Sequence, residues 1–145
     1  PMYYYQREIP KQEHYFDMSG KPLYPFGYGL SYTAFVYTNL LCTASKDKIE
    51  VKVTVKNTGK IPGQISTLLF VKLFGGSIIQ RTKLLKDFRK DTLQQEEQKT
   101  LLFTLHSEDF DYVDVDNQFR CANKAKIMIE DLSIDVILAD DISIE

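Results

Sequence analysis

Residues 49–59 read IEVKVTVKNTG, and this stretch decides the fold. Aliphatic residues occupy every odd-numbered position from Ile49 to Val55, while charged or hydroxyl side chains occupy the positions between them. A period of two with β-branched residues on the apolar side is typical of a strand that has one face in a core. Residues 57–60, NTGK, include an asparagine and a glycine, which tolerate left-handed backbone geometry. The stretch therefore predicts a half-buried strand that ends in a turn.

Comparable apolar or alternating segments recur along the chain, separated by polar or glycine-containing turns. No segment has the convincing spacing of apolar residues that an amphipathic helix needs. Many short strands without helices are typical of an all-β, antiparallel sandwich of immunoglobulin-like type. The expected strands are residues 35–42, 49–55, 64–74, 78–88, 98–105, 124–130 and 134–138, with a last edge at Ile142 and Ile144.

The same patterns predict which way some side chains point. Val53 and Leu102 are each placed on the apolar phase of a strand, so both are expected to face the core, whereas Lys52 is expected to face solvent. Residues 106–109, HSED, are expected to form one helical turn, because Ser107 or Asp109 could cap it.

Length and composition favour one domain with an N-terminal arm. A chain of 145 residues that is 43% hydrophobic can bury a single core. A net charge of −2 without a cluster of Lys and Arg argues against a nucleic-acid partner. No apolar run approaches the roughly 20 residues of a membrane span, so no membrane partner is expected. The order Pro1-Met2 suggests a piece excised from a longer protein.

The two cysteines, Cys42 and Cys121, have no CxxC or Cys/His spacing around them. We expect two buried thiols that pack as small hydrophobic groups, with a disulfide as the alternative. Unpaired cysteines favour a reducing, cytoplasmic location.

A second distinctive stretch is residues 23–35, LYPFGYGLSYTAF, which we call the connector. Proline and two glycines predict a bent, irregular path. Surface loops rarely carry five aromatic residues in thirteen, because each ring offers about 150–250 Å² that prefers burial. We expect another domain to cover these side chains, with sugar stacking or chance surface exposure as alternatives. Without that domain, we expect the chain to self-associate through residues 1–35 or to pack them on its own strands. The expected docking residues are Tyr24, Pro25, Phe26, Gly27, Tyr28, Gly29, Leu30, Tyr32 and Phe35.

Residues 24–33, followed by Phe35, resemble the segment that leads into the C-terminal fibronectin type III-like domain of glycoside hydrolase family 3 enzymes, the β-glucosidase and β-xylosidase group. Residues 53–59, 84–88 and 102–105 are similar to strands and turns of the same family, so the likeness extends over nearly the whole chain.

Some residues depart from the family pattern. Residues 93–97, LQQEE, replace the usual Leu-x-Pro-Gly-Glu, so that turn is expected to be wider or differently hydrogen-bonded. Asp87, Asn123 and Glu130 stand where the family tends to have glycine. Asparagine takes the left-handed region at modest cost, and glutamate pays more there.

The resemblance implies a Tyr-rich linker over residues 1–33 and a fibronectin type III-like sandwich over residues 34–145. It also implies a non-catalytic domain that braces the catalytic domains of a parent enzyme. That parent would hydrolyse terminal β-linked glucose or xylose with retention. The alternative is a stand-alone module that binds carbohydrate or protein.

Acidic residues gather in one segment, but they do not form a persuasive catalytic pair. A retaining glycosidase needs two carboxylates about 5–5.5 Å apart across the sugar, and a loop does not fix such a pair. A calcium site at residues 114–117 would lack the glycine and the final glutamate of an EF-hand loop. His14 and His106 have no evident nucleophile partner. We therefore expect no catalytic residue, metal or cofactor. The acidic candidates are Glu108, Asp109, Asp111, Asp114 and Asp116.

Overall fold

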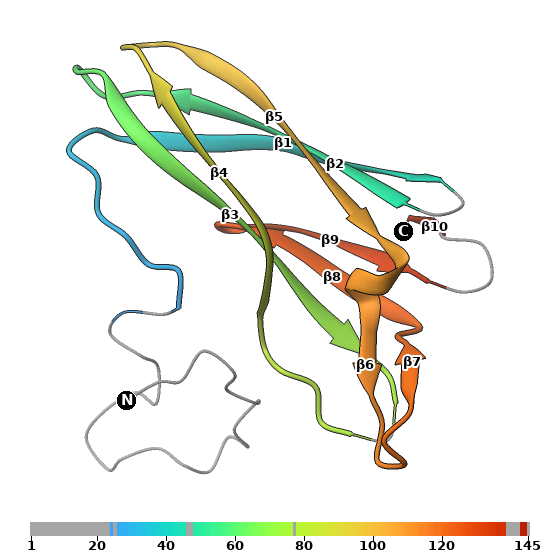
Figure 1. Cartoon of the computed structure of the whole chain (residues 1–145). Helices are drawn as coiled ribbons and strands as arrows, with labels where there is room; N and C mark the ends of the chain where they lie inside the picture. The colour runs from blue at the N-terminus through green and yellow to red at the C-terminus, as the bar shows by residue number, and fades with distance from the viewer. Residues whose placement is uncertain (1–23, 25, 46–47, 77, 139–142, 145) are drawn as a thin grey trace.

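The computed structural model describes residues 24, 26–45, 48–76, 78–138 and 143–144, and nearly all of its regular structure is β (Figure 1). The all-β prediction is confirmed. The elements are β1 (Phe35–Ser45), β2 (Lys48–Asn57), β3 (Gly63–Phe74), β4 (Leu84–Leu93), β5 (Gln98–His106), the 3₁₀ turn η1 (Ser107–Phe110), β6 (Asp111–Val113), β7 (Phe119–Cys121), β8 (Lys124–Ile129), β9 (Leu132–Ile137) and β10 (Ser143–Ile144). None of the described residues belongs to a helix long and apolar enough to cross a membrane.

Two antiparallel sheets stack face to face (Figure 1). The smaller sheet has the order β1-β2-β5, and the larger has the order β10-β9-β8-β3-β4. Strands β6 and β7 form a separate hairpin that projects from one end of the sandwich (Figure 1). Of the expected N-terminal arm, only residues 24 and 26–33 are described.

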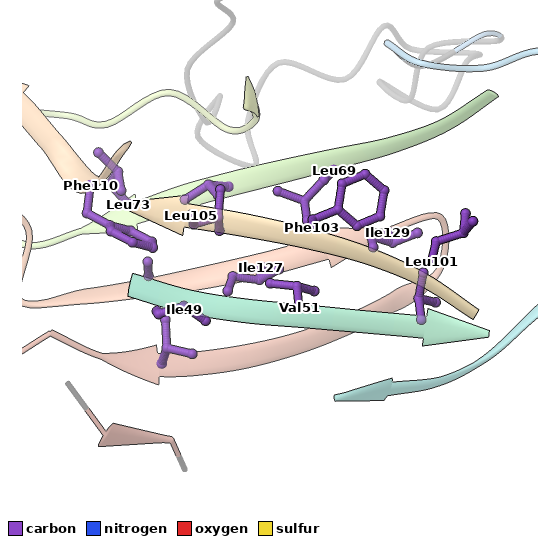
Figure 2. Close-up of a cluster of buried hydrophobic side chains, with 14 of the residues drawn as sticks. Ile49, Val51, Leu69, Leu73, Leu101, Phe103, Leu105, Phe110, Ile127 and Ile129 are labelled. Carbon is purple, nitrogen blue, oxygen red and sulfur yellow. The ribbon is translucent and has the colours of Figure 1, made fainter. Parts of the chain in front are cut away.

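The core lies between the two sheets, and the alternation in β2 is confirmed. Ile49, Val51 and Val53 are all fully buried. Figure 2 shows side chains from both sheets meeting in this layer, with Val51 from β2 of the smaller sheet and Ile127 from β8 of the larger sheet among them. Charged residues of β2 such as Lys52 point to the opposite face. The period of two thus divides one strand between core and solvent.

The predicted orientation of Leu102 is wrong. Leu102 is 41% exposed, and its neighbours Leu101 and Phe103 face the core instead. In the ladder between β2 and β5, Leu102 lies opposite Lys52, which places both on the outer face. Because β5 has apolar residues in both phases at this point, the sequence pattern alone did not fix the orientation.

The strand expected over residues 78–88 is also misplaced, since β4 runs from Leu84 to Leu93. Residues 89–92 are polar and lie beyond the end of the expected strand, yet they pair with β3 at the edge of the sheet. An edge strand tolerates charged side chains because one of its sides remains in water.

Two turns differ from expectation. Neither Asn57 nor Gly59 has a positive φ, so the turn after β2 does not use left-handed geometry. Of the two alternatives for the turn over residues 94–97, the wider turn is wrong, because the Glu97 N–H donates to the Gln94 carbonyl at 3.1 Å. The other alternative, different hydrogen bonding, is compatible with the Gln94 N–H, which donates to the Glu97 carboxylate at 2.6 Å. Glu96 takes φ 60° in that turn. Left-handed geometry therefore falls on a glutamate where the family has glycine, which costs stability.

The remaining local predictions gave mixed results. Glu130 has φ 51°, as the glycine of the family pattern suggests, whereas Asn123 has no positive φ. Residues 107–110 form the expected helical turn, but His106 stands at its N-cap. The Asp109 carboxylate accepts the His106 backbone N–H at 2.9 Å. Asp109 therefore stabilises the turn from its third position and not as the cap.

Candidate domain-docking surface

The C-terminal end of the connector is fixed by one buried amide. The Thr33 hydroxyl donates to Asn57 Oδ1 at 2.8 Å, and the Gly59 N–H donates to the same oxygen at 3.0 Å. Asn57 Nδ2 donates to the carbonyls of Ile61 at 2.9 Å and Leu93 at 3.2 Å. Asn57 is fully buried, so its two donors and two acceptor sites are all used. This side chain ties the connector to β2 and to the end of β4.

Two glycines allow the connector to lie this close. A Cβ on Gly59 would lie 1.9 Å from Thr33 Oγ1, and a Cβ on Gly63 would lie 2.4 Å from Thr33 Cγ2. The Thr58 N–H also donates to the Ala34 carbonyl at 2.8 Å. Both glycines are therefore required for close approach of the connector, and Gly59 does not serve the left-handed turn that the sequence suggested for it.

The N-terminal part of the connector lies on the outer face of the larger sheet. The Phe26 ring packs edge-on against Phe70 of β3, with 5.5 Å between ring centroids. Gly27 has φ 87°, and a Cβ there would lie 2.9 Å from the Phe70 ring and 3.3 Å from Leu68. Lys83 Nζ lies 5.0 Å from the centre of the same ring. The connector thus contacts the sandwich at both of its ends.

Between and around these contacts, the expected docking residues are largely in solvent. Tyr32 is fully exposed, and Leu30 is 87% exposed. The rings of Tyr24 and Tyr28 pack on each other with centroids 5.1 Å apart, yet both remain more than half exposed. Phe35 instead packs against the core as the first residue of β1. Of the expected set, Pro25 lies outside the described residues, and Gly29 has open space around it.

Five further apolar residues share the face on which the connector lies, and sequence reasoning did not select them. The sequence signalled two of them, Leu68 and Phe70, through the run LLFV at residues 68–71, which predicts a strand with apolar side chains on both faces. We call this group the outer band. It consists of Leu68, Phe70, Leu85, Phe88 and Met128.

An open groove of about 770 Å³ lies between the connector and the start of β3. Its walls include the Tyr28 and Ser31 side of the connector, Gln64 and Ser66 of β3, and Glu130 in the turn between β8 and β9. The groove therefore combines three aromatic residues, Tyr28, Phe35 and Tyr37, with hydroxyl, amide and carboxylate groups.

Two titratable side chains of β1 are more than half buried. The Tyr37 hydroxyl is hydrogen-bonded to Thr67 Oγ1 at 2.8 Å, and burial raises the pKa of Tyr37 to about 12. Burial likewise raises the pKa of the Cys42 thiol to about 11. Cys121 is exposed, which corrects the expectation that both cysteines are buried. Both cysteines are free, so the alternative of a disulfide between them is not realised.

The acidic segment is largely ordered into η1 and the β6–β7 hairpin. Asp114 Oδ2 lies 2.7 Å from Arg120 Nε, and Asp109 Oδ1 lies 3.6 Å from Lys86 Nζ. These carboxylates thus stabilise the fold. Across the described ranges, no three His, Cys, Asp or Glu side chains gather in a way that could hold a metal ion. The other acidic candidates, Glu108, Asp111 and Asp116, are exposed.

Comparison with known proteins supports the family that the sequence resembles. The family described as "Fibronectin type III-like domain" matches residues 67–130. A putative β-xylosidase of Formosa agariphila is 38% identical over 112 residues, which cover 74% of this chain and 15% of the relative. The β-glucosidase BoGH3A of Bacteroides ovatus is 40% identical over 98 residues, which cover 65% of this chain and 13% of the relative. The chain therefore spans only a small part of these relatives.

Solved structures agree with this relationship. A β-glucosidase from Erythrobacter marinus superposes with a TM-score of 0.83 at 31% identity, covering 96% of this chain and 20% of that one. A β-glucosidase from Listeria innocua with gluconolactone gives a TM-score of 0.76 at 28% identity, covering 89% of this chain and 20% of that one. The matched region is an accessory, non-catalytic part of such enzymes. The chain belongs to the C-terminal fibronectin type III-like domains of glycoside hydrolase family 3, the β-glucosidase and β-xylosidase group.

Proposed function

We propose that this chain braces the preceding catalytic part of a family 3 β-glycosidase. Residues 1–33 serve as the linker, and residues 34–145 form the domain. The parent enzyme hydrolyses terminal β-linked glucose or xylose with retention of configuration. The β-glucosidases and β-xylosidases among the relatives support this substrate class.

The observation that carries the proposal is a connector that is anchored and yet exposes its rings. Thr33 and Phe26 contact the sandwich, while Tyr32 is 101% and Tyr28 is 53% exposed. Ordered aromatic side chains in water are typical of a surface that another domain covers. Because the anchors already restrict the backbone, docking loses less conformational entropy than it would with a free segment.

A comparison between two lengths of protein tests the proposal. The double variant Tyr28→Ser, Tyr32→Ser leaves the urea unfolding of the 145-residue chain nearly unchanged, because both rings are exposed there. In the complete protein encoded by the reading frame, it lowers the free energy of unfolding by about 2–5 kcal/mol, since two ring burials are lost. Phe119→Ser on β7 is the matched control, as this ring is 81% exposed but lies away from the connector.

Two results contradict docking. The first is an equal effect of the double variant in the short chain and the complete protein. The second is a reading frame that encodes no catalytic domain before Pro1.

A carbohydrate-binding module is the second candidate, and the groove beside Tyr28 favours it. An aromatic ring beside amide and carboxylate groups suits the faces and hydroxyls of a pyranose. Titration of the 145-residue chain with a β-linked glucose or xylose disaccharide, followed by NMR, tests this function. Saturable changes in the chemical shifts of Tyr28 that disappear in the Gln64→Ala variant would show that the groove binds the sugar. Unchanged spectra would exclude binding of these disaccharides.

A further inference from the structure

We propose that the catalytic part of the parent packs on the outer band of the larger sheet, and not on the outer face of the smaller sheet. This inference rests on the proposed function and identifies the face of the sandwich that takes part in it. The partner surface it requires is apolar at its centre and carries carboxylates around that centre.

Strand pairing places all five residues of the outer band on one face. Leu68 and Phe70 point outward, because the residues that alternate with them in β3 face the core. Across the ladders, Phe88 of β4 lies opposite Leu68, and Met128 of β8 lies opposite Phe70. Directly opposite residues in antiparallel strands project to the same side.

A bulge in β4 completes the band. The register shifts so that Leu69 pairs with Asp87 while Phe70 pairs with Leu85, which leaves Lys86 as the extra residue. The extra residue turns Leu85 to the same face as Phe88, although the two are three positions apart. The Asp87 carboxylate accepts the Phe88 N–H at 2.7 Å, which stabilises the shifted backbone.

Within the described residues, the connector contacts this band at its middle strand, through Leu68 and Phe70 of β3. Phe70 is 4% exposed and packs on Phe26, whereas Phe88 is 57% exposed. The outer face of an antiparallel sheet is ordinarily polar, so an apolar band across three adjacent strands indicates a partner.

The outer face of the smaller sheet lacks such a band. Leu41 and Leu102 are exposed there, but Lys52 lies between them in the ladders. A row of hydroxyls crosses the same three strands, made of Thr38, Thr54 and Thr100. This face is therefore polar with isolated apolar residues, as expected of a surface in water.

The path of the chain points to the same face. Phe26 and Gly27 lie against Phe70 of β3, so the described part of the connector meets the larger sheet on its outer face. The chain covers 15% or less of the two relatives described above, which leaves a large partner to be accommodated.

Charge identifies the chemistry of the partner. Five lysines project from the same face as the outer band. Two of them, Lys124 and Lys126, form ion pairs with Asp135 at 3.1 Å and 3.6 Å. A basic surround favours a partner surface that carries carboxylates. The lysines of this face are Lys72, Lys83, Lys90, Lys124 and Lys126.

Cysteine labelling of the complete protein tests the inference without disturbing the core. Phe88→Cys and Leu102→Cys are made separately in a background that carries Cys42→Ala and Cys121→Ser, and each is labelled with a maleimide fluorophore. We expect Phe88→Cys to react at least about tenfold more slowly in the complete protein than in the 145-residue chain, because a docked domain excludes the reagent. The rate at Leu102→Cys is expected to change less than about twofold.

A third position separates this inference from the proposed function. Slow labelling at Tyr32→Cys together with fast labelling at Phe88→Cys would support docking through the connector but would show that the outer band is not the docking face. Fast labelling at both positions would overturn both proposals. Protection at Leu102→Cys equal to that at Phe88→Cys would show that the wrong face had been assigned.

Discussion

Replacing Asn57 with alanine tests the anchor of the connector. The substitution removes four hydrogen bonds and leaves the carbonyls of Ile61 and Leu93 without their amide donor in a buried site. Each bond contributes about 1 kcal/mol net, and a buried group left without a partner costs about 1–3 kcal/mol. We therefore expect Asn57→Ala to lower the free energy of unfolding by about 3–5 kcal/mol, a large part of the roughly 5–15 kcal/mol of a typical domain.

Thr33→Val is the matched control for this prediction. It removes one donor while keeping the volume of the side chain, and Asn57 Oδ1 still accepts the Gly59 N–H. We expect a loss of about 1 kcal/mol, together with faster proteolysis within residues 26–33, because only the connector is released. Urea unfolding gives the free energies, and mass spectrometry locates the cuts. Equal losses for the two variants, or a loss below about 1 kcal/mol for Asn57→Ala, would refute the role assigned to this amide.

The remaining predictions concern the core and the response to pH. Val53→Asp places an unpaired charge at a fully buried position, so it lowers the free energy of unfolding by several kcal/mol, whereas Lys52→Asp on the outer face changes it little. Equal midpoints of urea unfolding for the two variants would show that the residues of β2 have been assigned to the wrong faces of the sheet. Burial raises the pKa of Tyr37 to about 12 against 10 for a free tyrosine, so the unfolded chain loses this proton first as pH rises. Stability is therefore fully present below pH 10 and falls between pH 10 and 12. Tyr37→Phe makes that fall less steep in urea titrations, and an unchanged slope would contradict the assignment.

The sequence predicted those strands whose apolar residues occupy a single phase. In β2, every aliphatic side chain falls on one face, so a shift of one residue would expose the whole set. In β5, by contrast, Leu101, Leu102 and Phe103 are consecutive, and either phase buries apolar surface. The pairing with β2 decides between them, and pairing is a tertiary property. Where several apolar residues follow one another, the sequence therefore does not decide which of them face the core.

The candidate surface was predicted only in part, for a related reason. Aromatic composition singled out the connector, because those side chains are contiguous in sequence. The outer band is assembled from three strands and depends on the bulge at Lys86, and no local sequence pattern predicts that bulge. The role of Gly59 was also missed, since the contact that requires glycine comes from Thr33, far away in sequence.

Two anchors on the connector have a consequence for the docking we propose. If Thr33 were the only anchor, the connector before it could extend from the sandwich in many directions. The second contact, of Phe26 and Gly27 with Phe70, restricts it to one face. A short tether with a fixed direction raises the effective concentration of one domain at the surface of the other, so even a weak contact is occupied. Loss of the second anchor should therefore weaken docking even where every docking side chain is intact. Gly27→Val, whose side chain would meet the Phe70 ring at a positive φ, would separate this contribution from that of the exposed rings.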